Sequence, residues 1–138
     1  MAFAHGSQAV LKLGTVSQPT TPVDISQYLN SVTDSFSRDS AETTTFGKTA
    51  KTYIPGLKDG TISAEGRFDP TVDAQLYALF DQGTIVDFEY GPAGTSAGSP
   101  KYTGQCFVTS YEVETPVDDV GTFSLELQIV DNVTRSTY

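Results

Sequence analysis

Hydrophobic and polar positions alternate most clearly in the segment GTISAEGRF, residues 60–68. An alternation with a period of two predicts a β-strand with one buried face and one face in solvent. The two sets are Ile62, Ala64, Gly66 and Phe68 on the expected inner face, and Thr61, Ser63, Glu65 and Arg67 on the outer one.

The period changes to that of a helix at Asp69-Pro70. Asp69 is suited to cap a helix, because its carboxylate can accept hydrogen bonds from the exposed amides of the first turn, and Pro70 suits the first helical position. Gly83 is placed to end this helix. The apolar residues of the segment share one helical face: Val72, Leu76, Leu79 and Phe80.

Five further segments predict strands, at 8–15, 31–38, 84–90, 105–114 and 122–130. Residues 54–60, IPGLKDG, have the composition of a turn. In the strand at 84–90, the expected inward side chains are Val86, Phe88 and Tyr90, with Asp87 and Glu89 outward. The order of strands, one helix and more strands predicts a mainly β protein, an antiparallel β-sandwich or partial barrel with one flanking α-helix.

The last two strands form the clearest hairpin signal in the chain. The expected inner residues are Phe107, Tyr111, Val113, Phe123, Leu125, Leu127 and Ile129. The expected outer residues are Glu112, Glu114, Thr122, Ser124, Glu126 and Gln128. One face of this hairpin is therefore polar, and its charged residues are all acidic.

The segment at about 38–54 is too polar for a core strand, yet rich in residues that favour β structure. Its large apolar residues are Phe46 and Tyr53. We interpret it as a long, partly ordered loop or a β-arm, and an edge hairpin that covers the sheet is an equal alternative. Long loops in compact domains are often functional.

Composition narrows the class of protein. A chain of 138 residues suits one domain, here residues 1–138 with an N-terminal arm at 1–7 and a C-terminal arm at 131–138. Its 17 acidic and 8 scattered basic side chains give a net charge of −9, which argues against a nucleic-acid grip. A single cysteine cannot form an intrachain disulfide, and no apolar run is long enough for a membrane helix.

Residues suited to catalysis or metal binding are few. His5 is the only histidine, so a Ser–His–Asp or Cys–His arrangement would have to use it, and Cys106 is expected to be a small strand residue. The turn at 118–121 lacks the regular acidic ladder of a calcium loop. Paired carboxylates such as Glu112 with Glu114 have no tryptophan beside them to line a sugar cleft. We therefore expect no enzyme, no metal and no cofactor.

Three segments carry a resemblance to a known family. They are DISQYLNSVTDSFSRDSAETTTFG (24–47), GLKDGTISAEGRFDPTVDAQLYALF (56–80) and VGTFSLELQIV (120–130). In this order they resemble the major tail proteins, or tail tube proteins, of long non-contractile-tailed bacteriophages. The resemblance covers most of residues 8–131.

The resemblance implies a structural subunit of the virion tail, assembled in the host bacterial cytoplasm. Such subunits form hexameric rings that stack into a hollow tube, with DNA passing through a β-barrel lumen without specific binding. The implied partners are further copies of the chain and the tape-measure, tail terminator and distal tail proteins, with no membrane.

Within that picture we assign two sets of residues as hypotheses. The lumen is expected to be lined by Glu112, Glu114, Glu126, Gln128, Thr122 and Ser124, although Glu65, or Asp87 with Glu89, could be the lining set instead. Contact between rings is expected at Phe46, Lys48, Lys51 and Tyr53, with packing inside the subunit as the alternative. An acidic lumen would let DNA slide rather than stick.

Two other functions remain open at this point. The tube of a bacterial contractile injection or type VI secretion system has a similar fold, although the segment at 24–47 fits phage tail proteins better. A monomeric β-sandwich that binds a sugar or a receptor would instead predict a stable monomer with a ligand pocket.

Overall fold

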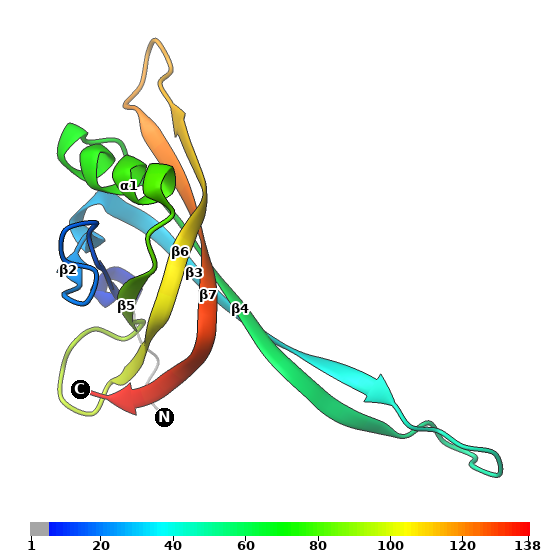
Figure 1. Ribbon diagram of the computed structural model, residues 1–138. Helices are drawn as coiled ribbons and strands as arrows, with labels where there is room; N and C mark the ends of the chain where they lie inside the picture. Colours follow the sequence, from blue (N-terminus) through cyan, green and yellow to red (C-terminus); the bar gives the residue numbers. More distant parts are fainter. Residues whose placement is uncertain (1–5) are drawn as a thin grey trace.

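A computed structural model describes residues 6–138 of the chain as one open, strongly twisted antiparallel sheet with a single α-helix (Figure 1). The strand order is β2-β1-β5-β6-β7-β4-β3. The mainly β fold with one flanking helix is confirmed, and all of its strands belong to this one sheet. The elements are η1 (Gly6–Gln8), β1 (Val10–Leu13), β2 (Val23–Asp24), η2 (Ser26–Tyr28), β3 (Leu29–Glu42), β4 (Tyr53–Arg67), α1 (Pro70–Gln82), β5 (Val86–Gly91), β6 (Pro100–Glu114) and β7 (Thr122–Thr137).

Helix α1 begins and ends where the sequence places it. The Asp69 carboxylate accepts a hydrogen bond from the Thr71 N–H, Pro70 is the first helical residue, and Gly83 ends the helix in the left-handed conformation with φ 63°. Phe80 was expected on the buried face but is 44 % exposed, and its ring lies beside Tyr77 instead. No helix in the described part of the chain is long and apolar enough to cross a membrane.

The core lies between α1 and one face of the sheet, which we call the core face. The helix contributes Val72, Leu76 and Leu79, and the sheet contributes the inward side chains of β1, β4, β5, β6 and β7. Its largest fully buried sheet residues are Phe88, Phe123, Leu11, Leu13, Ile62, Leu125 and Leu127. The alternation at 60–68 therefore predicts correctly that Ile62, Ala64 and Gly66 are buried.

The segment at 54–60 is a strand and not the turn that its composition predicts. It lies inside β4, where Pro55 pairs with Ser40 of β3. The pairing of β4 with β7 begins only at Thr61, so Pro55 has no ladder on its other side and its missing N–H costs little.

A register shift between Val108 and Ser110 changes which side chains of β6 point inward. Phe107 pairs with Gln128 on the outer face, while Tyr111 pairs with the buried Leu125. The prediction that Phe107 shares a face with Tyr111 and Val113 is therefore wrong, because one extra residue reverses the alternation.

The polar segment at 38–54 forms the distal half of a long β-hairpin. Strands β3 and β4 stay paired as far as Glu42 and Tyr53, and the hairpin projects away from the body of the molecule (Figure 1). At the other end of the chain, β7 continues to Thr137 beside β6, so the expected C-terminal arm lies along the sheet. Residues 1–5 of the expected N-terminal arm, with His5, lie outside the described residues.

Candidate assembly surfaces

The sheet has a second face with no helix on it, which we call the polar face. The register of β3, β4, β7 and β6 places their outward side chains in rows across four strands. One row is Ser31, Glu65, Ser124 and Glu112, and the next is Thr33, Ser63, Glu126 and Ser110. The six residues expected to line a lumen all lie on this face, at positions 112, 114, 122, 124, 126 and 128.

The charged residues of the polar face are mostly acidic. On these four strands Glu65, Glu112, Glu114 and Glu126 are exposed, and Arg67 is the basic neighbour at the edge of the set. None of the four glutamates forms an ion pair within the described part of the chain, where the one salt bridge joins Lys12 to Glu89. Their charges therefore face solvent uncompensated.

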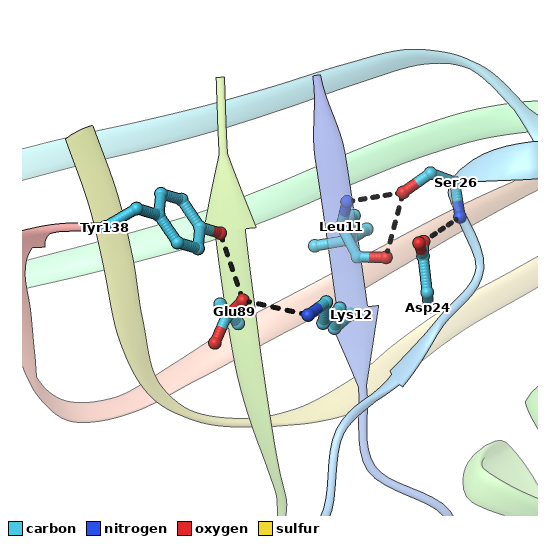
Figure 2. A network of polar contacts seen from close by, with 6 residues as sticks. All are labelled: Leu11, Lys12, Asp24, Ser26, Glu89 and Tyr138. Atoms are coloured by element: carbon cyan, nitrogen blue, oxygen red, sulfur yellow. Dashed lines mark hydrogen bonds and ion pairs between the residues drawn. The ribbon is translucent and has the colours of Figure 1, made fainter. Parts of the chain in front are cut away.

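Asp87 and Glu89 lie on the same face of the sheet but are held by other side chains. Asp87 accepts a hydrogen bond from the Gln105 amide at 3.4 Å. Glu89 pairs with Lys12 at 3.4 Å and accepts a hydrogen bond from the Tyr138 hydroxyl at 3.0 Å (Figure 2). Glu89 of β5 thus contacts both Lys12 of β1 and Tyr138.

The same network extends to the β2 edge of the sheet (Figure 2). The Ser26 hydroxyl accepts from the Leu11 N–H at 2.8 Å and donates to the Leu11 carbonyl at 3.3 Å, while Asp24 accepts from the Ser26 N–H at 2.9 Å. The backbone N–H and carbonyl of Leu11 are therefore both hydrogen-bonded to a side chain at this edge.

Two long strand edges have no strand partner within the described chain. Strand β3 pairs with β4 alone, and β6 pairs with β5 only from Tyr102 to Cys106, so the far edge of β6 is open from Phe107 to Glu114. The strands between these edges, in the order β6-β7-β4-β3, alternate in direction. Open edges of this kind are templates for pairing with another chain.

The arm tip, residues 43–52, carries the other predicted contact residues. Phe46 is fully exposed, and Lys48 and Lys51 give the tip a charge of +2 with no acidic residue. The tip is ordered by Thr43, whose N–H donates to the Thr52 carbonyl at 2.7 Å and whose hydroxyl lies 2.9 Å from that of Thr52. Tyr53, at the base of the tip, is also exposed, so these side chains do not pack inside the subunit.

The acidic turn, residues 114–121, joins β6 to β7 at the opposite end of the sheet. It projects past α1 (Figure 1) and contains Glu114, Asp118 and Asp119 without a basic residue. Val117 is fully exposed and Val120 is half exposed. The sequence at 118–121 predicts a turn, and Val117 and Val120 follow no period that would mark them as part of a strand or helix.

Asp34 is a carboxylate that the sequence analysis did not single out. It pairs with the buried Ile62, so it lies on the core face of β3. Both of its carboxylate oxygens are buried without a hydrogen-bond partner, and burial raises the pKa of Asp34 to about 6. A charged residue inside an otherwise apolar alternation was the available signal.

The described residues offer little for catalysis. Burial raises the pKa of the Cys106 thiol to about 12, so it stays protonated. Residues 6–138 contain no cluster of three metal-ligating side chains. A groove of about 220 Å³ at the base of the arm is lined in part by Phe36 and Tyr102, whose ring centroids are 5.5 Å apart.

Comparisons with known proteins agree with this geometry. A family model described as phage tail tube protein matches residues 4–135. No match was found among curated protein sequences. Among solved structures, the fold is similar to the tail of an empty gene transfer agent particle refined with C6 symmetry, at a TM-score of 0.82 and 15% identity over 98% of this chain and 100% of that chain.

Two further solved structures share the fold. The SPP1 tail tube gives a TM-score of 0.77 at 11% identity, covering 99% of this chain and 80% of that one. The sheath–tube complex of an extracellular contractile injection system gives 0.72 at 14% identity, covering 99% and 93%.

Proposed function

Because the chain belongs to the phage tail tube protein family, we propose that it assembles into hexameric rings that stack as a hollow conduit for DNA. The observation that carries this proposal is the pair of open edges on one polar-faced ribbon of four strands, β6-β7-β4-β3. A surface that exposes two different complementary edges can join head to tail, and such joining gives a ring when the rotation between neighbouring subunits closes.

The direction of the strands supports this way of closing. Strands alternate across β6-β7-β4-β3, so β3 of one subunit would run antiparallel to the open part of β6 in the next. Six subunits, the symmetry of the similar gene transfer agent tail, would give a barrel of 24 strands. A barrel of that size encloses a water-filled channel.

The polar face would line the bore, because the core face is occupied by α1 and the apolar cluster. Exposed Glu65, Glu112 and Glu126 would then repel the phosphates of DNA, and no basic row exists on these strands to hold it. Transport without specific binding follows from that electrostatic balance. In this proposal the subunit is structural and performs no catalysis.

The proposed setting is the virion tail, after assembly in the cytoplasm of the host bacterium. Partners would be further copies of the chain and the tape-measure, tail terminator and distal tail proteins. A second candidate is the tube of a contractile injection system, favoured by the shared fold with that sheath–tube complex. Purified particles that contain the chain would separate the two candidates. DNA in the particles would favour the phage tail, and a protein cargo would favour the injection system.

Electron microscopy of the purified protein across a concentration series, paired with light scattering, tests the proposal. Hollow tubes or six-membered rings are expected. A species that remains monomeric at every concentration, with or without other tail proteins, would contradict it and would favour a binding module.

A further inference from the structure

The arm tip and the acidic turn lie at opposite ends of one strand. Strand β4 starts beside the arm tip at Tyr53 and ends at Arg67, which pairs with Thr122 directly after the acidic turn. Its 15 residues span about 50 Å in extended conformation. A subunit therefore presents the two features on opposite sides, where a copy above and a copy below could reach them.

The two features are complementary in charge and in apolar surface. The arm tip has two lysines and no acid, although the chain as a whole carries −9, and the acidic turn has three acids and no base. Each exposes a large apolar side chain completely, Phe46 on the tip and Val117 on the turn. Within residues 6–138, no other part of the subunit covers either side chain.

We propose that the arm tip of one copy docks on the acidic turn of a copy in the adjacent ring. Lys48 and Lys51 would pair with Asp118 and Asp119, and Phe46 would pack against Val117. This inference rests on the proposed function, since it requires stacked rings, and it names the surface that receives the arm.

The energetics suit reversible stacking. One exposed ion pair contributes little and is weakened further by salt, so a single contact would be weak. Repetition around a ring makes the contacts act together, because once one tip has docked the others bind at high effective concentration. Tube length should therefore fall as ionic strength rises.

A charge swap provides the test. The variants are K48E/K51E on the arm tip, D118K/D119K on the acidic turn, and the combination of all four substitutions. We expect each double variant to form rings but to shorten tubes at least about tenfold, since like charges then meet at every contact. The combined variant restores opposite charges and should recover most of the wild-type length.

Ring formation and tube length are read separately, by mass of the smallest assembly and by electron microscopy. Wild-type tube length for both double variants, shortening by only one of them, or a combined variant as short as the doubles would overturn the docking proposal. Absence of rings and tubes in the wild-type protein would instead overturn the proposed function. Thermal unfolding of each variant confirms that the exposed substitutions leave the fold intact.

Discussion

The Tyr111 hydroxyl donates a hydrogen bond to the Asp73 carboxylate at 2.7 Å, and this contact joins strand β6 to the first turn of α1. Burial and the Asp73 carboxylate both raise the pKa of Tyr111 above its usual value. The tyrosine therefore stays protonated and remains a donor throughout the range in which the protein would be handled. The contact fixes the helix over the strand whose open edge is a candidate joint.

Tyr111→Phe should lower the free energy of unfolding by about 1–2 kcal/mol, because the carboxylate loses a charge-assisted hydrogen bond. Urea unfolding followed by circular dichroism measures the change. Tyr77→Phe is the matched control, since Tyr77 lies exposed on α1, the helix that carries Asp73. Equal losses in the two variants would show that the Tyr111 hydroxyl contributes nothing specific.

Asp34→Asn should stabilise the folded subunit by about 1 kcal/mol at pH 8, since it removes a buried charge that has no partner. This expected gain in stability is smaller than the full rise in the pKa of Asp34 implies, because part of the residue reaches solvent. The nearby titratable groups are Tyr90 and Cys106, whose pKa values burial raises further from neutrality.

The sign of the Asp34 effect sets its pH dependence. Its folded pKa, about 6, lies above the usual 3.8, so its contribution to stability is complete below about pH 4 and is lost as pH rises through 6. The advantage of Asp34→Asn should therefore vanish near pH 4. Thermal unfolding of both proteins from pH 4 to 8 measures it, and a constant difference across that range would refute the explanation.

Gly66→Ala should destabilise the subunit by about 2–3 kcal/mol, because a Cβ at this position would collide with the backbone carbonyl of Tyr28. Backbone cannot rotate away as a side chain can. Gly6→Ala, where a Cβ would meet no atom within 4 Å, is the control and should leave the midpoint of chemical unfolding unchanged. Equal stability of the two variants would mean that Gly66 and the Tyr28 carbonyl do not approach each other as closely as described.

Replacing residues 43–52 by Asn-Gly should leave a folded subunit that cannot form long tubes. The pair Glu42 and Tyr53 would then close a two-residue hairpin, a loop length that favours this turn sequence. Circular dichroism reports folding, and sedimentation with electron microscopy reports assembly. Tubes of normal length would show that the arm is dispensable.

Glu126→Lys should slow DNA ejection from particles while tubes still form, because every ring would then carry lysines where the bore meets phosphates. The control is Asp81→Lys, an equal charge change on the exposed side of α1. Ejection is timed by the fluorescence of a dye that binds released DNA. Identical kinetics for the two variants and the wild type would remove Glu126 from the bore.

Much of the fold could be predicted from local sequence. The start of α1 is fixed by Asp69 and Pro70 and its end by Gly83, each acting through its own local conformation or capping contact. The inward set of β7 follows from simple alternation. The strand at 54–60 was missed because Pro55 and Gly56 favour turns, and only the missing β7 neighbour makes them acceptable there.

The candidate surfaces could be predicted only in part. Sequence identified the outward side chains of β7 and of β4 from residue 61 onward, but the row that joins Glu65, Ser124 and Glu112 depends on a strand order that no local pattern contains. The register shift at Val108 likewise moves Phe107 onto the polar face. Asp34 could not be found from sequence because its burial depends on the pairing with Ile62. The acidic turn could not be found because the partner that we propose for it lies on another copy of the chain.

Helical reconstruction by electron cryomicroscopy of the assembled protein tests the central claim most directly. The account predicts a hollow tube whose rings close through β3 of one subunit and the open edge of β6 in the next, with Glu112 and Glu126 facing the bore and α1 on the outside. A solid fibre, or a tube whose bore is lined by α1, would contradict it.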